Sequence, residues 1–376
     1  MPSSSPRTFR VLDTTAAFDE AKDAWKRLEQ ATAHSNVSAS YDWLRTWWEV
    51  FEKREDNQFG YDKKLRILTA WRGDALEAVV PLVRLVRKKW LLKVSYVEFL
   101  GQQWGATWLD LIAKDRPREV VEAAFEWLRT HERFDVVRLA YLTDRTQTFD
   151  LRDPHVSLLS ACPMVEAAKY GDYAAFEKTA YSAKLRYNIR RWRKKVAEQG
   201  LACTHEVVPG PAADLDDLAR LSRSKMEDDK RSLYLDADKR RFVDLVRQRV
   251  PCDVELVKLD GRSAAYRVLF RFGAGVFSFD TSYDRKYRDL SLGHLLYVES
   301  IRRFFEQRLG AFQCCGTGVN PNKLDHYKEM VRLYSFTRPG NTILGYAATT
   351  WELSRQKRIE QAVRASLAAA GAGGSP

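Results

Sequence analysis

The hydrophobic positions along the chain predict the same order of elements in each half. Apolar residues that recur about every three to four positions indicate helices, and alternating ones indicate strands. In the first half this pattern predicts helices near 16–28 and 42–51, a hairpin of strands 65–71 and 75–83, a strand at 96–100, a helix at 117–131 and a strand at 136–139. In the second half it predicts helices near 214–229 and 237–249, a hairpin of strands 254–259 and 264–271, a strand at 276–280, a long helix and a strand at 311–315. Two copies of one α/β unit fit this repetition better than one large sheet.

Residues 276–309 have the pattern of a strand, a basic loop and a long amphipathic helix. The loop contains Arg288-x-x-Ser291-x-Gly293 directly before the helix. The first N–H groups of a helix lack backbone partners and the helix dipole adds partial positive charge there, so such a turn favours a bound pyrophosphate. A structural alternative stays open, because a serine N-cap and a glycine also occur in turns that bind nothing.

This loop resembles the acyl-CoA pyrophosphate loop of the GNAT acyltransferase superfamily, whose usual form is Arg/Gln-x-x-Gly-x-Gly/Ala between a strand and a helix. Ser291 stands in place of the first glycine. The resemblance implies that acetyl-CoA or another acyl-CoA binds as co-substrate at Arg288, Leu290, Ser291, Leu292, Gly293 and His294. The equivalent connection of the first half, residues 101–108, has no basic residue and does not lead straight into a helix. The donor site is therefore predicted in the second half.

A narrower resemblance comes from the run 283–296, the Trp-rich helix around 41–48, a basic helix in mid-chain and the pair Tyr327-Lys328. In this order they are similar to the acetyltransferase group associated with cellulose and exopolysaccharide biosynthesis, whose relatives are the Fem peptidoglycan aminoacyltransferases. The resemblance implies an α/β (α+β) protein of tandem GNAT-like folds, each a mixed, mostly antiparallel sheet flanked by helices. The expected domains are 1–165, 166–350 with the donor site, and a helical to disordered tail at 351–376.

Acyl transfer from a thioester needs one group that takes the proton of the acceptor and one that protonates the departing thiolate. Asp280, at the carboxyl end of its strand, is the candidate general base; pairing with a nearby arginine or capping of the loop is its alternative role. Tyr327, expected on a helix after the last core strand, matches by resemblance the tyrosine that protonates coenzyme A sulfur, and a core tyrosine is the alternative. His294 and His326 are further candidates, because imidazole titrates near neutral pH.

The densest charge cluster spans 184–195, where seven residues are Lys or Arg. An apolar stripe at helical spacing predicts that this segment is an amphipathic helix docked on the body, through Leu185, Ile189, Trp192 and Val196. We expect Arg190, Arg191 and Arg193 to bind an anionic acceptor. A sugar nucleotide, a lipid diphosphate, an acidic membrane surface and an RNA acceptor arm all fit, and a solvated charged face without a partner is the alternative.

Composition narrows the class of protein. The chain has 376 residues, 45% of them hydrophobic, and a net charge of +12, which favours anionic partners. No apolar run approaches the roughly 20 residues of a membrane span, and the first residues lack the apolar stretch of a signal peptide, so a cytoplasmic protein is expected. Five cysteines show no CxxC or Cys/His metal spacing; we interpret them as reduced thiols and expect no metal.

Together these features predict an acyl-CoA-dependent N- or O-acyltransferase, most simply an acetyltransferase, that acts on a sugar, sugar nucleotide or related small acceptor in polysaccharide or cell-envelope biosynthesis. Two alternatives stay open, a Fem-like aminoacyltransferase that uses charged tRNA and a catalytically silent scaffold of a polysaccharide synthase. The expected partner is a small or sugar-linked anionic acceptor, with peripheral contact to a membrane or a polysaccharide synthase as a further option. A nucleic-acid partner is less favoured and enters with the aminoacyltransferase alternative.

Overall fold

The chain divides into two units, Met1–Ala161 with Val331–Pro376 and Cys162–Met330. The structure is a computed structural model and describes residues 7–33, 36–89, 92–146, 148–225 and 232–369. The first predicted domain boundary, after residue 165, lies near the observed one, but the second unit ends at Met330 and not at 350.

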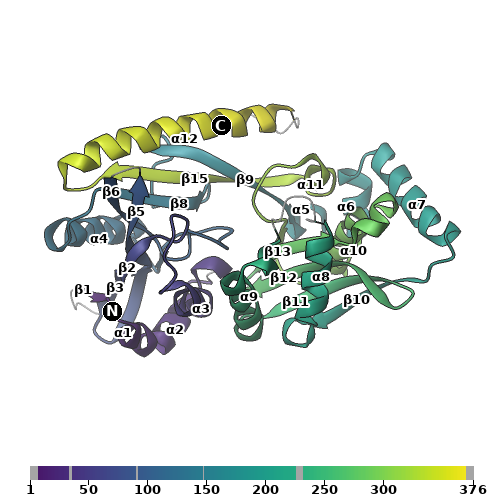
Figure 1. The fold of residues 1–376 in the computed structure, drawn as a ribbon, viewed down its shortest axis with the longest axis horizontal. Coiled ribbons are helices and arrows are strands. Elements are labelled where there is room, and N and C mark those ends of the chain that lie inside the picture. Colours follow the sequence, from purple (N-terminus) through teal and green to yellow (C-terminus); the bar gives the residue numbers. More distant parts are fainter. Residues whose placement is uncertain (1–6, 34–35, 90–91, 147, 226–231, 370–376) are drawn as a thin grey trace. The chain divides into compact units, whose positions relative to one another are not determined.

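The elements of the first unit are coloured purple to blue and, at its C-terminal end, yellow in Figure 1. Its strands are β1 (Thr8–Leu12), β2 (Tyr61–Leu65), β3 (Ile67–Arg72), β4 (Ala75–Val80), β5 (Leu82–Lys89), β6 (Leu92–Phe99), β7 (Ile112–Ala113), β8 (Val136–Thr143) and β15 (Glu329–Pro339). Its helices are α1 (Thr15–Glu20), α2 (Lys22–Ala31), α3 (Tyr41–Phe51), α4 (Pro117–His131) and α12 (Ile343–Ala369). One sheet has the order β1-β3-β4-β7, and the other strands run in the order β15-β8-β6-β5-β2.

The second unit follows the strand β9, which leads into it. Its strands are β9 (Val156–Glu166), β10 (Cys203–Pro209), β11 (Cys252–Leu259), β12 (Arg262–Phe272), β13 (Gly275–Tyr283) and β14 (Phe312–Cys314). Its helices are α5 (Ala167–Tyr170), α6 (Tyr173–Ala180), α7 (Ala183–Glu198), α8 (Leu215–Lys225), α9 (Ala237–Arg249), the 3-10 helix η4 (Arg285–Leu290), α10 (Leu292–Glu306) and α11 (Pro321–His326). The strand order is β10-β11-β12-β13-β14-β9, antiparallel except for the parallel pair β13–β14.

Both units are mixed α/β folds with a mostly antiparallel sheet flanked by helices, as predicted. The repeated part of the pattern also holds, since each unit contains a third strand, a helix and a further strand that runs parallel to the third: β6–α4–β8 and β13–α10–β14. Parallel neighbours need such a crossover, whereas antiparallel neighbours need a short turn. Helices α4 and α9 have the predicted bounds, and the predicted helix at 16–28 is two helices, α1 and α2.

The C-terminal segment differs from its prediction as a separate tail. β15 pairs with β8 from Leu333↔Thr143 to Pro339↔Val136, and α12 packs on β6 and β8. These contacts place the segment in the first unit, which a pattern along the chain does not reveal. The predicted fading of the tail into disorder concerns residues 370–376, which lie outside the described residues.

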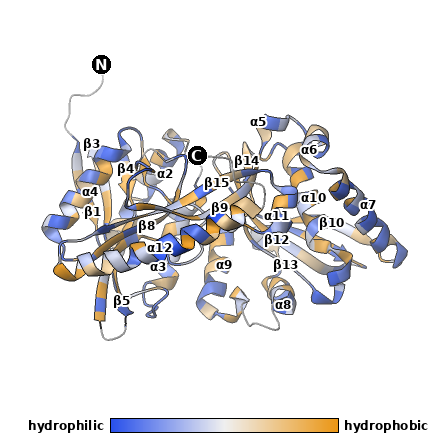
Figure 2. Cartoon of the chain, turned by 90° about the horizontal axis from the view of Figure 1, so that it is seen from above, coloured by the Kyte–Doolittle hydropathy of each residue, from blue (hydrophilic) through white to orange (hydrophobic). Residues whose placement is uncertain are grey.

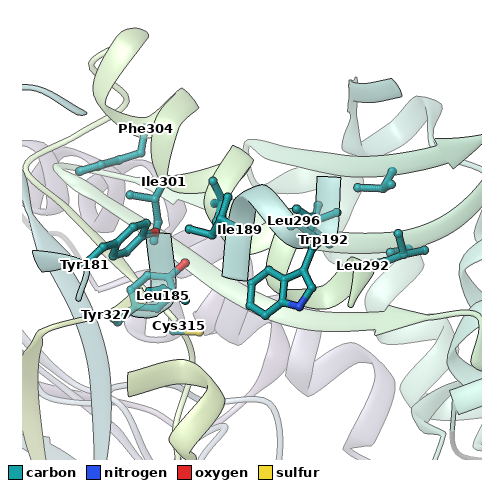
Figure 3. Close-up of a cluster of buried hydrophobic side chains, with 14 of the residues drawn as sticks. Tyr181, Leu185, Ile189, Trp192, Leu292, Leu296, Ile301, Phe304, Cys315 and Tyr327 are labelled. Atoms are coloured by element: carbon teal, nitrogen blue, oxygen red, sulfur yellow. The ribbon is translucent and has the colours of Figure 1, made fainter. Parts of the chain in front are cut away.

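The predicted amphipathic helix at 184–195 is confirmed as α7, which carries both hydrophilic and hydrophobic residues in Figure 2. Its apolar stripe is buried in one cluster with side chains of α10, as Figure 3 shows for Ile189, Trp192, Leu292 and Leu296. Full burial of each aliphatic side chain stabilises the fold by about 1.5–3 kcal/mol, so the stripe fixes this helix firmly. Among the helices described, none has the length and apolar content that a membrane span requires.

Candidate active site

The parallel strands β13 and β14 separate, and a cavity lies where they part. They pair over three positions, from Gly275↔Phe312 to Phe277↔Cys314. β14 ends there while β13 continues to Tyr283, and its register with β12 shifts because Asp280 pairs with Val268 but Ser278 pairs with Leu269. The extra residue, Phe279, is a β-bulge, which bends a strand and redirects its side chains.

The cavity between the separated strands has a volume of about 570 Å³. That is within the range of small-molecule sites, roughly 300–1,000 Å³. Its walls come from β13, η4 and the start of α10, the turn after β14, and one residue of α8: Lys225, Ser278, Phe279, Asp280, Thr281, Tyr283, Arg288, Ser291, Leu292, Gly293, His294, Tyr297, Cys315, Gly316, Thr317, Asn320, Asn322 and Lys323. The cavity therefore contains Asp280 and five of the six residues that were predicted to bind the donor.

Leu290 is the one predicted donor-binding residue that does not line the cavity. Its side chain is buried in the apolar cluster beneath the loop, so it anchors η4. This corrects its role from contact to support, although its backbone stays part of the loop.

The start of α10 has no side-chain cap. Ser291 is the N-cap residue, yet its side chain makes no capping hydrogen bond and its backbone is left-handed, with φ of 54°. The structural alternative of a serine cap is therefore wrong here. Leu292 and Gly293 hold the first positions of the helix, where N–H groups have no intrahelical acceptor. The uncapped positive end of this helix faces the cavity and favours an anion.

Gly293 leaves the approach to these N–H groups open. A Cβ atom built at this position would meet Tyr283 Cδ1 at 3.8 Å, which is ordinary contact. The protein itself therefore has room for a side chain at 293, and the empty space serves a ligand rather than the packing of the fold.

Cations outnumber carboxylates on the described walls of the cavity. Arg288 is largely exposed, Lys323 donates from Nζ to the carbonyl of Thr317 at 2.9 Å, and Lys225 reaches the carbonyl of Thr281 at 3.4 Å. Burial lowers the pKa of Lys225. Against these cations stands Asp280, so the site attracts a negatively charged ligand.

Asp280 is held in place by two donors. The hydroxyl of Tyr266 donates to its Oδ2, and the backbone N–H of Thr281 donates to its Oδ1 at 2.9 Å. Burial raises the pKa of Asp280, while the hydrogen bonds from Tyr266 and Thr281 and the charge of Lys225 oppose that rise. A carboxylate with a raised pKa is a stronger base, which suits proton abstraction near neutral pH.

Tyr327 lies behind the cavity wall. It follows α11 instead of lying within it, its ring is fully buried, and its hydroxyl accepts a hydrogen bond from Arg267 Nη1 at 2.5 Å. Burial raises its pKa well above the ordinary value. This placement argues against direct contact of Tyr327 with a bound thioester.

Tyr297 is the tyrosine that lines the cavity, and the sequence analysis missed it. Its ring packs edge to face on Tyr327 with centroids 5.8 Å apart, and the guanidinium of Arg267 lies 5.1 Å from its centroid. Burial raises the pKa of its hydroxyl, which keeps it protonated. Residues four apart share one face of a helix, so the spacing from Gly293 to Tyr297 carried the signal.

The basic helix α7 braces the donor loop. Trp192 stacks on His294 with centroids 4.6 Å apart, and Lys195 Nζ donates to the carbonyl of Asp289 at 2.9 Å. His294 Nδ1 is also hydrogen-bonded to His326 Nε2 at 2.9 Å, and burial lowers the pKa of both imidazoles, which therefore stay neutral. These contacts make α7 a positioning element for the loop.

The predicted acceptor-binding arginines do not line the cavity. Arg190, Arg191 and Arg193 are exposed on α7, and Arg193 pairs with Glu299 of α10 at 2.7 Å. Their position beside the loop leaves an acceptor role untested. Within the described ranges, no group of three or more His, Cys, Asp or Glu residues is arranged to hold a metal ion.

Comparison with known families is decisive for the second unit. Residues 183–329 match the model of an acetyltransferase (GNAT) domain. This segment is a GNAT domain. It spans α7 to the start of β15 and includes the whole cavity, so the chain is an enzyme of the acyltransferase class. No curated protein sequence matches the chain.

Solved structures resemble this chain over most of its length at low sequence identity. FemX is 10% identical, with 84% of this chain and 96% of that chain covered and a TM-score of 0.55. A conserved protein of unknown function from Bacteroides thetaiotaomicron is 11% identical, with 87% and 99% covered and a TM-score of 0.52. A tandem GNAT protein from the clavulanic acid biosynthesis pathway is 12% identical, with 89% and 98% covered and a TM-score of 0.46. The similarity to FemX and to the Bacteroides protein shows a shared fold.

Proposed function

We propose that the GNAT domain transfers an acyl group, most simply acetyl, from an acyl-CoA to an amine or hydroxyl of a small acceptor. The observation that carries this proposal is the uncapped start of α10, which faces a cavity with Asp280 on the opposite strand. A pyrophosphate needs the first of these features and proton transfer needs the second.

Each wall of the cavity has a role in this proposal. The N–H groups of Leu292 and Gly293, with Arg288 and Lys323 nearby, hold the pyrophosphate of coenzyme A. The acyl-CoA supplies an activated carbonyl. The bulge in β13 turns backbone polar groups toward the gap between the strands, where they stabilise the oxyanion that forms on that carbonyl.

Proton transfer falls to two side chains of the cavity. Asp280 takes the proton from the acceptor nitrogen or oxygen as it attacks the thioester carbon. The carbon–sulfur bond then breaks, and Tyr297 gives its proton to the departing sulfur and regains one from solvent. Tyr327 and Arg267 position the ring of Tyr297 from behind.

The acceptor in this proposal is an anionic sugar, sugar nucleotide or related molecule of polysaccharide or cell-envelope biosynthesis in the cytoplasm. Its support is the exposed face of α7, where Arg190 and Arg191 stand beside the braced donor loop. The same face also fits charged tRNA, and this observation keeps the aminoacyltransferase as the second candidate.

Thermal melting of the full chain tests the donor. A ligand that binds only the folded state raises the melting temperature with its concentration. Acetyl-CoA and coenzyme A should raise it, with longer acyl-CoAs as the comparison for chain length and bulk RNA as the comparison for a tRNA donor. A shift with RNA and none with any coenzyme A ester would refute the proposal and favour the aminoacyltransferase.

Neutral substitutions on α7 test the acceptor. Changing Arg190, Arg191 and Arg193 together to Gln should raise the acceptor KM and flatten its dependence on salt, because phosphate contacts by arginine weaken steeply with salt. Affinity for acyl-CoA should stay unchanged. The matched control removes three exposed cations of the first unit by substitution with Gln at Lys22, Arg27 and Lys53. Loss of acyl-CoA binding with unchanged acceptor kinetics would instead assign α7 to the donor site.

A further inference from the structure

The first unit has a cavity at the position that corresponds to the donor cavity of the second. β6 and β8 run parallel from Tyr96↔Val136 to Glu98↔Arg138, as β13 and β14 do, and β6 then ends while β8 continues. A cavity of about 440 Å³ lies next to this end. It is lined by Asn57, Gln58, Arg87, Lys88, Lys89, Gln102, Gln103, Arg138, Ala140, Tyr141, Leu159, Ser335, Trp351, Glu352, Arg355, Gln356 and Ile359.

Two buried carboxylates organise the cations of this cavity. Glu98 is fully buried and accepts from Arg87 Nη2 at 2.8 Å and from Arg138 Nη2 at 2.6 Å. Glu352 of α12 accepts from Lys89 Nζ at 2.5 Å and from the Tyr96 hydroxyl at 2.7 Å. The side chains of three strands and one helix are thereby held in a fixed arrangement.

Both carboxylates are ionised. Burial acts against ionisation of Glu98, but the charges of Arg138 and Arg87 outweigh it and lower its pKa to about 2. For Glu352, burial is likewise outweighed by Arg138 and by hydrogen bonds from Lys89 and Tyr96, which lower its pKa.

The cavity nevertheless keeps an excess of positive charge. Five cations line it, namely Arg87, Lys88, Lys89, Arg138 and Arg355, against Glu352 on its wall and Glu98 beside it. Five cations and two carboxylates leave three positive charges, a surplus that favours an anion.

Several buried polar atoms at this cavity lack a partner within the described part of the chain. They are Nε of Arg87, Nε of Arg138, Oε1 of Gln103 and Oε1 of Gln356. Gln356 is only 6% exposed, and its Nε2 is already used by Ser335 and Thr337. An unmet buried polar atom costs about 1–3 kcal/mol, so four of them around one cavity indicate that something else satisfies them.

The remaining walls offer groups for a ring that carries hydroxyls. Amide side chains of Asn57 and Gln102 stand among the cations, and the indole of Trp351 is 47% exposed. Lys89 Nζ lies 3.5 Å from the centroid of that indole and holds it at the rim. A phosphate would use the cations, and a sugar ring would use the amides and the aromatic face.

We propose that this cavity is a second ligand site, which binds a small phosphorylated sugar or a similar anion with hydroxyl groups. It lies wholly within the first unit and shares no residue with the donor cavity. The site is therefore independent of the proposed acyl transfer.

Hydrogen exchange of the full chain, followed by mass spectrometry, tests this site. The probes are glucose 1-phosphate, inorganic phosphate and glucose, with coenzyme A present in every sample to fill the donor cavity. Glucose 1-phosphate should slow exchange of amides in 351–359, inorganic phosphate should do so less, and glucose should have no effect. Protection by glucose alone, or protection by none of the three probes in this segment, would overturn the proposal.

Two rim cations provide a variant that spares the buried network. Lys88 and Arg355 are exposed, so their change to Gln should leave the fold intact and weaken glucose 1-phosphate by about tenfold. The matched control, Lys357→Gln with Arg358→Gln, removes the same charge from α12 outside the cavity and should bind as the unchanged chain does. Equal affinity in the rim variant and in the control would also overturn the proposal.

Discussion

Replacing Gly293 by Val should abolish tight binding of coenzyme A while the protein stays folded. The nearest atom to a Cβ at this position is Tyr283 Cδ1 at 3.8 Å, so the side chain fits the free protein. Valine is no worse than glycine in a helix, so the free energy of unfolding should stay the same or rise slightly. The same side chain would cover the N–H groups of the first turn, which a phosphate oxygen must approach to about 2.7–3.2 Å.

The expected loss follows from those N–H groups. Hydrogen bonds to a charged group contribute about 1.5–3 kcal/mol each. Loss of the two at Leu292 and Gly293 costs about 3–6 kcal/mol, which raises the Kd of coenzyme A by about 10²- to 10⁴-fold. Gly293→Ala should lie between the unchanged protein and Gly293→Val.

Isothermal titration with coenzyme A, alongside a thermal melt of each variant, makes the measurement. Ala237→Val is the control, because it places the same side chain at the exposed first position of α9, away from the cavity. If Gly293→Val melts normally and binds coenzyme A within about threefold of the unchanged protein, the pyrophosphate does not lie on α10 and the donor assignment is mistaken.

Ser291→Gly should raise the free energy of unfolding in urea by about 0.5–1 kcal/mol, since φ of 54° strains any residue but glycine, and a loss of stability would contradict this. Asp280→Asn should lower turnover by about 10²- to 10⁴-fold with coenzyme A affinity intact. Because burial raises the pKa of Asp280, the native rate should rise with pH through a value above the ordinary range, and the Asn variant should lose this inflection. The same raised pKa means that ionisation of Asp280 destabilises the folded state as pH increases, so Asp280→Asn should gain stability relative to the native chain at pH 8 compared with pH 4, and equal differences at both would count against it. Tyr297→Phe should reduce turnover and not stability, whereas Tyr327→Phe should lower the free energy of unfolding by about 1–3 kcal/mol through loss of the acceptor of Arg267, and the reverse pattern would restore Tyr327 as the proton donor.

The donor loop shows how far local signals reach. The strand, basic loop and amphipathic helix were visible in the sequence, because hydrophobic periodicity and a glycine before a helix are properties of neighbouring residues. The cavity contains Arg288, Ser291, Leu292, Gly293 and His294 as predicted, and whether they bind acyl-CoA is for the titration to decide. The side chain of Ser291 was ambiguous, and the backbone conformation shows that it does not cap α10.

The choice between two tyrosines needed the tertiary structure. Tyr327 matched a family pattern, yet Arg267 of β12 holds its hydroxyl behind the wall, and Tyr297 of α10 reaches the cavity instead. Whether a side chain faces a cavity depends on which helix and strand pack together, and such contacts join residues far apart in the sequence. The pairing of Tyr266 with Asp280 was hidden for the same reason.

The sequence by itself therefore determined the two α/β units, the amphipathic helix at 184–195 and the place of the donor loop, since each depends on propensities and periodicity within one segment. The tertiary structure alone decided that residues 331–376 belong to the first unit and that Glu98 and Glu352 meet the same cluster of cations. The physical reason is that strand pairing and buried ion pairs are set by the packing of the whole chain, where contacts between segments about 250 residues apart are as strong as local ones.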